Sequence, residues 1–284
     1  MATLYVVATP VGNLNDMTPR ALETLRAVSL IAAEDTRVTS KLTRHFGIRT
    51  PLTSYHRHNE ESKARWIADR MLEENIDVAL TADAGTPGIS DPGYRLVTLC
   101  SEHNISIIAV PGVSSLTAAL SVCGFHIPEF AFYGFLPREK KSLKEKLIAI
   151  SQSVPVAVVF ESPFRVVHMI EILHEVLPDT RVCLCCDLTK RFELTIRGSA
   201  SQILQALRDN PKAEKGEYCA VLDFHDIQAP EPKNAAADSL EALLVKQMLT
   251  GLTLHEAQCS LAAEGNKKNE VYQAALRLKG LFSG

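Results

Sequence analysis

The residues best suited to binding chemistry gather in one short stretch, TADAGTPGISDPG at 81–93. This stretch contains three glycines, two prolines and two aspartates, and it directly follows the strand-like run at 77–80. Glycine lets the backbone approach a bound molecule closely, and proline limits the freedom of a loop. Asp83 stands at the strand end, where its carboxylate can accept hydrogen bonds or balance a cationic ligand. The stretch therefore predicts a loop that cradles a ligand.

Three further strand-like runs end in turns of the same kind. The runs at 4–8, 30–33 and 105–110 lead into TPVG (9–12), EDTR (34–37) and PGVSS (111–115). Because ligands of an open α/β sheet bind at the carboxyl ends of its strands, four such loops at one edge would form a cleft. Any one of them alone could be merely a tight turn. The sequence has neither G-x-G-x-x-G nor G-x-x-x-x-G-K-[ST], which disfavours ordinary dinucleotide or triphosphate binding.

Helical segments must separate and position these strands. Thr18-Pro19 is typical of a helix start, and Gly47 and Gly124 are plausible helix ends. Further helices are expected at 66–74 and 94–103, with Trp66 in the core. This alternation of strands and helices favours a largely parallel α/β sheet.

A second block of strands and helices starts near residue 130. Its expected strands lie at 154–160, 181–187, 193–197 and 217–224, and its helices at 143–150, 163–177 and 201–209. Two strands in near succession, 181–187 and 193–197, predict some antiparallel pairing and hence a mixed sheet. Cys183, Cys185 and Cys186 lie in an apolar strand without a second pair of ligands, so core packing is favoured over zinc binding, and no metal is predicted.

The end of the chain forms a third, small unit in this interpretation. Helices are expected at 240–249, after the capping box of Thr253 with Glu256, and along the stripe of Val271, Ala275 and Leu278. Three short helices with tight turns resemble a helix-turn-helix. The expected domains are an α/β domain with the cofactor loops, a second α/β domain that closes the cleft, a linker and a helical domain, at 1–115, 116–226, 227–238 and 239–284.

Bulk composition is that of an ordinary globular protein. A length of 284 residues favours two or three domains, and a net charge of −3 gives no global electrostatic case for nucleic acid. No apolar run approaches the roughly 18 residues of a membrane span, so no membrane partner is expected. The N-terminus lacks a basic segment and predicts a first strand rather than a signal peptide. The odd count of seven scattered cysteines favours reduced thiols and a cytoplasmic location.

Local basic clusters nevertheless stand beside the expected cleft. In one of them five basic residues (Arg138, Lys140, Lys141, Lys144 and Lys146) face only Glu139 and Glu145. The segment 55–59, YHRHN, adds an aromatic side chain and further donors. Each cluster alone is typical of a solvated surface, but its position beside the cleft motifs favours RNA binding.

Eight motifs in order carry a resemblance. They are TPVGN (9–13), EDTR (34–37), DAGTPGISDPG (83–93), PGVSS (111–115), GFLPRE (134–139), FESPFR (160–165), DLTKRFE (187–193) and KGEY (215–218). Over residues 4–225 the chain resembles the bacterial 16S ribosomal RNA (cytidine 2′-O)-methyltransferase family, which has the tetrapyrrole-methylase-type fold. The tail resembles the helix-turn-helix module of that family. Phe164 and Phe192 stand where a polar residue is common, which is a departure from the pattern.

The resemblance implies S-adenosylmethionine as the cofactor, bound folded between the two α/β domains. From the first domain it implies that Pro10, Gly12, Asp83, Ala84, Gly85, Ile89, Ser114 and Ser115 line the site. Leu136, Glu161 and Ala220 would close it from the second domain. The start of the helix at Ser114-Ser115 suits the carboxylate of the methionine part, because free N–H groups and the helix dipole favour an anion.

The implied reaction methylates the ribose 2′-hydroxyl of a cytidine in the decoding region of 16S ribosomal RNA. This hydroxyl is a poor nucleophile at neutral pH, so a nearby acceptor should help to remove its proton. The candidate bases are Asp35, Glu34 and Glu161, although Asp35 could equally serve only as a helix N-cap. The candidate RNA contacts are Arg37, His56, Arg138, Lys140, Arg165, Lys190 and Arg191.

Two alternatives remain open at this point. The first is an enzyme of the same fold that methylates a tetrapyrrole or another small molecule, against which the helical tail and the basic segments argue. The second is a non-catalytic RNA-binding assembly factor. The expected partner is 16S ribosomal RNA or the small ribosomal subunit, and the resemblance also implies a homodimer.

Overall fold

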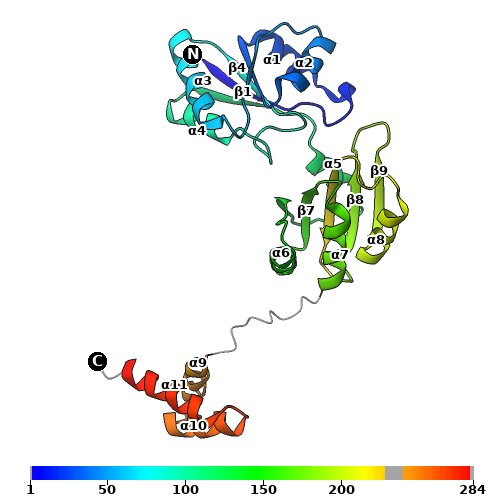
Figure 1. The fold of residues 1–284 in the computed structure, drawn as a ribbon. Coiled ribbons are helices and arrows are strands. Elements are labelled where there is room, and N and C mark those ends of the chain that lie inside the picture. Colours follow the sequence, from blue (N-terminus) through cyan, green and yellow to red (C-terminus); the bar gives the residue numbers. More distant parts are fainter. Residues whose placement is uncertain (1, 228–238, 282–284) are drawn as a thin grey trace. The chain divides into compact units, whose positions relative to one another are not determined.

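The computed structural model describes residues 2–227 and 239–281 (Figure 1). Residues 1–228 form one compact unit and residues 229–284 a second. The predicted linker at 227–238 lies outside the described residues except for its first residue. Each unit is described by itself.

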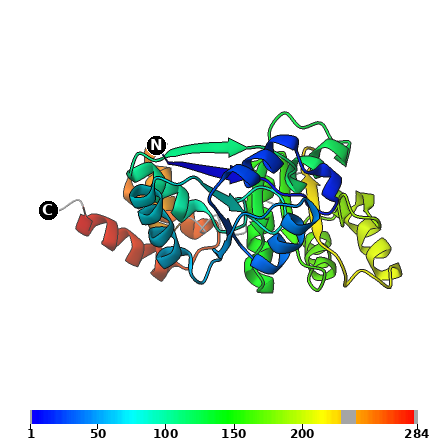
Figure 2. The ribbon, with the colours of Figure 1, turned by 90° about the horizontal axis from the view of Figure 1, so that it is seen from above.

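The first sheet is entirely parallel. It consists of β1 (Thr3–Val7), β2 (Leu30–Ala33), β3 (Leu52–Ser54), β4 (Val78–Thr81) and β5 (Ser106–Val110), in the order β3-β2-β4-β1-β5. Figure 2 shows β1 and β5 side by side and running in the same direction. The predicted parallel sheet is confirmed, and all of its strands end at the same edge.

Helices cover both faces of this sheet because successive side chains of a strand point to opposite faces. Ile31 of β2 packs with residues of α1 (Pro19–Ala27) and α2 (Thr36–His45). Its neighbours Leu30 and Ala32 pack on the other face with residues of α3 (Glu60–Glu74) and α4 (Tyr94–Glu102). The central strands β2 and β4 are buried at every position, which explains why their side chains are almost all apolar.

The first domain differs from the prediction in two respects. The edge strand β3 and the short 3-10 helix η1 (Leu14–Asp16) were not predicted, since three residues are too few for a periodic pattern. The prediction that Trp66 lies in the core is wrong, because the side chain is 41% exposed. The Lys63 ammonium lies 3.9 Å from the centre of the Trp66 ring, and the Arg70 guanidinium lies 5.1 Å from it, so cations cover this indole on the surface of α3.

The second sheet is mixed, as predicted. It consists of β6 (Ala131–Phe135), β7 (Val156–Glu161), β8 (Arg181–Cys186), β9 (Leu194–Ser199) and β10 (Tyr218–Asp223), in the order β6-β7-β10-β8-β9. Only β6 and β7 pair in parallel, and the other pairs are antiparallel. Since β7 and β8 are both antiparallel to β10, they run in the same direction and end at one edge of the sheet.

Helices also cover both faces of the second sheet. The larger core packs α6 (Lys140–Ser153), α7 (Val166–Val176) and α8 (Ala200–Asp209) on one face. On the other face α5 (Ser115–Cys123) packs against Cys183 and Cys185, which are buried as predicted. The helix that follows β5 thus contributes to the core of the second sheet.

The second unit is a bundle of three helices, α9 (Leu240–Leu249), α10 (Leu254–Ala263) and α11 (Lys268–Leu281). Thr253 and Glu256 form the predicted capping box at the start of α10. The predicted stripe of Val271, Ala275 and Leu278 is buried together with Leu244 and Leu261.

No helix in the described ranges is both long and apolar enough to cross a membrane.

Candidate active site

Backbone hydrogen bonds join the loops that follow the strands of the first sheet. Thr9 and Gly85 exchange both of their backbone hydrogen bonds, at 2.8 and 2.9 Å. The Asp35 N–H donates to Asp83 Oδ1 at 3.0 Å, and the Asp83 N–H donates to Glu34 Oε2 at 3.2 Å. The predicted meeting of the loops after β1, β2 and β4 at one edge is therefore confirmed.

A buried tyrosine positions the far end of the 83–93 loop. The Tyr55 hydroxyl donates to Glu60 Oε1 at 3.1 Å and accepts from the Leu96 N–H at 3.1 Å. Glu60 Oε1 also accepts from the Gly93 N–H at 2.9 Å. Gly93 has φ 155°, and a Cβ at this position would lie 3.2 Å from the Gly88 nitrogen. Because Tyr55 is fully buried, the prediction of an RNA-contacting aromatic in segment 55–59 is wrong.

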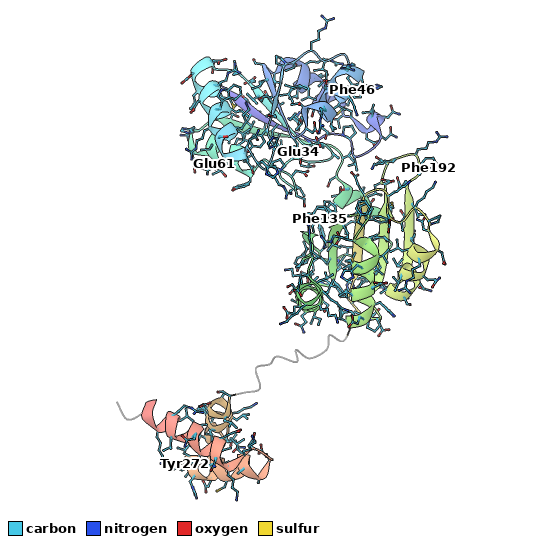
Figure 3. All side chains as sticks on the ribbon, in the orientation of Figure 1. Glu34, Phe46, Glu61, Phe135, Phe192 and Tyr272 are labelled. Carbon is cyan, nitrogen blue, oxygen red and sulfur yellow. The ribbon has the colours of Figure 1, made fainter. Side chains whose placement is uncertain are left out.

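A cavity of about 320 Å³ lies between these loops and the strand ends of the second sheet, a size within the usual range for small-ligand sites. Figure 3 shows the two lobes with Glu34 on the first and Phe135 on the second. The lining residues are Val11, Ala84, Gly85, Thr86, Ile89, Ser90, Asp91, Ser114, Ser115, Phe135, Phe160, Glu161, Ser162, Pro163, Leu188, Glu217, Tyr218 and Cys219.

Part of the predicted cofactor set lines this cavity. It comprises Ala84, Gly85, Ile89, Ser114, Ser115 and Glu161. The other predicted residues, Pro10, Gly12, Asp83, Leu136 and Ala220, are not among the lining residues in the described part of the chain. Leu136 and Ala220 belong to the core of the second sheet, and their neighbours Phe135 and Cys219 line the cavity instead.

Gly12 lies where a loop of the first sheet meets a loop of the second. A Cβ at Gly12 would lie 2.3 Å from Lys190 Cγ and 3.2 Å from the Leu188 carbonyl oxygen. The adjacent Asn13 N–H donates to Thr189 Oγ1 at 3.1 Å. Glycine thus permits close approach of the two loops, and Leu188 continues from this contact into the cavity wall.

The start of α5 faces the cavity through Ser114 and Ser115. Ser114 is the N-cap, and its side chain makes no capping hydrogen bond to the helix. The first N–H groups of a helix have no partner within the helix, and the helix dipole favours negative charge near them. This wall of the cavity can therefore bind an anionic group.

Glu161 supplies the opposite charge on the second wall. Its side chain is 1% exposed, and its Oε1 accepts from the Ser162 N–H at 2.7 Å. Within residues 2–227 and 239–281, Oε2 accepts no hydrogen bond, although it lies 3.1 Å from Arg165 Nη2 in an ion pair. Burial raises the pKa of this carboxyl above its ordinary value. A buried carboxylate on a cavity wall, with one oxygen that is ion-paired but makes no hydrogen bond among the described residues, offers an acceptor to a ligand that carries N–H groups or positive charge.

Four carboxyl groups in the loops that follow β2 and β4 differ in their pKa. Hydrogen bonds from Arg37 lower the pKa of Asp35 to about 2. Burial is the main cause that raises the pKa of Glu34 and of Asp83. Burial, with the charge of Glu34 next, raises the pKa of Asp91 to about 7. Asp91 lines the cavity, whereas Glu34, Asp35 and Asp83 are not among its described lining residues.

Most of the predicted RNA contacts are already engaged within the protein. Arg37 is paired with Asp35 at 2.6 Å and Lys140 with Glu175 at 3.5 Å. Lys190 lies 2.8 Å from Asp187 and 3.1 Å from Glu217. Arg138 and Arg191 are exposed, and no ion pair holds either one among the described residues. His56 is partly buried, and its Nδ1 makes no hydrogen bond in the described structure.

Arg165 is the most fully engaged of these cations. Its Nη2 donates to the carbonyl oxygens of Leu136 at 2.9 Å and Pro137 at 3.1 Å, in addition to the ion pair with Glu161. It therefore joins the end of β6 to the end of β7 beneath the cavity.

Asp91 and Phe135 are cavity residues to which the sequence assigned no role. Asp91 is the second acid of the 81–93 stretch, and that position was the available signal. Phe135 lies within the GFLPRE motif, but only the register of β6 reveals which of its side chains faces the cavity.

Comparisons with known proteins identify the family of this chain. Residues 3–204 match the model of the tetrapyrrole (corrin/porphyrin) methylases. The chain is 41% identical over 281 residues to the ribosomal RNA small subunit methyltransferase I of Escherichia coli O157:H7, covering 98% of this chain and 96% of that protein. It is 39% identical over 282 residues to the protein of the same name from Synechocystis sp., covering 98% and 99%.

A solved structure shares the fold. The uroporphyrin-III C-methyltransferase of Thermus thermophilus in complex with S-adenosylhomocysteine has a TM-score of 0.54 at 17% identity, over 78% of this chain and 97% of that chain. At this level of identity the likeness establishes the arrangement of the sheets and nothing of the ligands.

Because Arg165 is ion-paired with the buried Glu161, its removal should destabilise the fold. Arg165→Ala should lower the free energy of unfolding of residues 1–228 by about 3 kcal/mol, because it leaves the buried Glu161 carboxylate without its nearest cation. Arg191→Ala is the matched control and should change it by less than about 0.5 kcal/mol, since its side chain is exposed. Urea unfolding followed by circular dichroism measures both. Equal losses of unfolding free energy in the two variants would contradict the structural role of Arg165.

Proposed function

The chain belongs to the tetrapyrrole methylase family, in the branch of the ribosomal RNA small subunit methyltransferases I, and from this premise we propose that it methylates the ribose 2′-hydroxyl of a cytidine in the decoding region of 16S ribosomal RNA. The methyl donor is S-adenosylmethionine. The observation that carries this proposal is the cavity with a helix start on one wall and a buried carboxylate on the other.

The residues of the cavity fit this donor part by part. The N–H groups at the start of α5, next to Ser114, suit the carboxylate of its methionine part. Glu161 can accept from a donor group of the ligand with its Oε2, which is ion-paired with Arg165 but makes no hydrogen bond in the described structure. Ile89, Phe135 and Leu188 offer apolar surface to a purine ring. When bound, S-adenosylmethionine supplies an electrophilic methyl group on a positively charged sulfur.

The work of the protein is then to position the hydroxyl and to accept its proton. Asp35 is a weak base in this structure, because its carboxylate is paired with Arg37 and its pKa is lowered to about 2. Glu34 uses Oε2 to hold the Asp83 N–H. Asp91 lines the cavity and has a pKa raised to about 7, so it is the carboxylate best suited to act as the base.

RNA rather than a tetrapyrrole is the proposed substrate because exposed cations stand near the cavity. Arg138 follows the Phe135 wall, and Arg191 follows Leu188. A helical unit such as α9–α11 can position RNA, although its sequence balances five basic residues against four glutamates. Four further points remain predictions: the cytoplasmic location, the assembled small subunit as substrate, the homodimer and the domain boundaries. The packing of α5 against the second sheet supports a boundary near residue 115.

Methyl transfer tests the function directly. The purified chain, incubated with labelled S-adenosylmethionine and either free 16S ribosomal RNA or assembled small subunits, should label one cytidine. A matched RNA with 2′-deoxycytidine at that position should receive no label, because it lacks the acceptor oxygen. Label that persists on the deoxy substrate would place the methyl group on a base instead. A chain that binds the RNA and the donor but transfers nothing would favour the assembly-factor alternative.

The role of Asp91 predicts a pH dependence. A base must be deprotonated to act, so the single-turnover rate at saturating RNA and donor should rise with pH and level off above about pH 7. The charged groups that act on Asp91 are Glu34, Arg57 and Asp83. Asp91→Asn should lower the rate by about 10²- to 10⁴-fold and abolish this rise.

Asp35→Asn is the control variant and should keep the rise near pH 7, since the low pKa of Asp35 gives it no titration in this range. Unchanged donor affinity, measured by calorimetry, confirms that each variant is folded. A wild-type rate that is flat from pH 5.5 to 8.5, or an Asp91→Asn variant with full rate, would remove Asp91 from the mechanism.

A further inference from the structure

We propose that Phe164 and Phe192 form a stacking platform for the bases of single-stranded RNA beside the cavity. The inference rests on the proposed function and concerns the nucleotides next to the methylated one. Phe164 is 79% exposed and Phe192 is 75% exposed, more than any other large apolar side chain within the described residues 2–227. Water contact of this extent is unfavourable for a phenyl ring unless a partner covers the ring.

Topology places both side chains at the edge of the second sheet that holds the cavity. Phe164 follows the end of β7 and comes directly after Ser162 and Pro163, which line the cavity. Phe192 lies in the connection from β8 to β9, which begins with the lining residue Leu188. Since β7 and β8 run in the same direction on either side of β10, the two loops rise from one edge. Figure 3 shows Phe135 and Phe192 at the end of this lobe that faces the first sheet.

The loop that carries Phe192 is held in a fixed conformation. Asp187 and Thr189 have φ values of 52° and 67°, which non-glycine residues rarely adopt. The Thr189 N–H donates to Glu193 Oε2 at 2.6 Å, and the Lys190 N–H donates to the Asp187 carbonyl at 3.0 Å. A pre-ordered loop loses little conformational freedom when it binds a ligand, so an exposed ring on it is a good anchor.

Cationic side chains lie close to the rings, and a surface that binds nucleic acid needs such cations to pair with the phosphates. The Arg191 guanidinium lies 5.5 Å and the Lys212 ammonium 5.7 Å from the centre of the Phe192 ring. Arg138 is exposed on the loop after β6, close in sequence to the cavity residue Phe135. Aromatic rings that stack bases, beside cations that meet phosphates, are the usual means of binding single strands without reading their sequence.

A second copy of the chain is the other conceivable partner for exposed phenylalanines. The charge around them argues against it, because a symmetric contact would bring Arg191 and Lys212 of one copy close to the same residues of the other. Like charges at an interface are unfavourable. The polyanionic RNA backbone complements the same cations.

The experiment measures the affinity for an RNA that carries the target cytidine, by fluorescence anisotropy at several salt concentrations. Phe164→Ala and Phe192→Ala should each raise the Kd by about 5- to 100-fold, the loss expected for one stacked base. Phe192→Tyr should keep the affinity, because a tyrosine ring stacks equally well. The slope of log Kd against log salt should stay unchanged in these variants and fall by about one in Arg191→Ala.

Trp66→Ala is the matched control. Trp66 is an exposed aromatic residue with two cations over its ring, but its helix α3 contributes none of the described residues that line the cavity. This variant should bind RNA as the wild type does. Donor affinity, measured by calorimetry, should be unchanged in all of these variants.

Three results would overturn the platform while leaving the proposed function intact. In the first, the wild type methylates RNA and both alanine variants bind RNA normally. In the second, Trp66→Ala weakens binding as much as they do. In the third, light scattering shows that the alanine variants lose a dimer while their RNA affinity is kept. A wild type that methylates no RNA is a different result, because it contradicts the proposed function itself.

Discussion

The parallel pairing of β2, β4, β1 and β5 is the constraint on which the site depends. Parallel strands end at the same edge, so the sheet alone brings four separate stretches of sequence together there. Hydrogen bonds between the loops then fix their relative positions, with Thr9 bonded to Gly85 and Asp35 bonded to Asp83. The two acids of the 81–93 stretch take different positions as a result. Asp83 joins the loops, and Asp91 faces the cavity.

The second sheet converts this edge into an enclosed site. It contributes Phe135 and Phe160 as apolar walls and Glu161 as a buried charge. Burial favours the neutral form of a carboxyl, and it is the largest cause of the raised pKa of Glu34, Asp83, Asp91 and Glu161, with neighbouring carboxylates adding to it for the first three. The same partial exclusion of water that closes the cavity around a small molecule therefore also produces a carboxylate that can accept a proton near neutral pH.

Sequence patterns were sufficient for the fold class, the order of most elements and the loops of the site. Apolar runs with glycine-rich ends predict the strands of a parallel sheet, and Thr253 with Glu256 marks the start of α10 correctly. The pattern failed where a tertiary contact decides the outcome. β3 pairs with the edge of β2, and the buried hydroxyl of Tyr55 is satisfied by Glu60 and Leu96. Trp66 stays 41% exposed on α3, where Lys63 and Arg70 of its own helix approach its ring. The difference between Leu136 and Phe135 at the cavity depends on strand register, which motifs do not contain.

The central claim is that one cavity, closed by both sheets, binds the methyl donor. A crystal structure of the full chain grown with S-adenosylhomocysteine tests it most directly. The account predicts density between Gly85 and Glu161, with the ligand carboxylate at the N–H groups that follow Ser114. The ligand bound at another place, or an empty cavity at a saturating concentration of ligand, would contradict it.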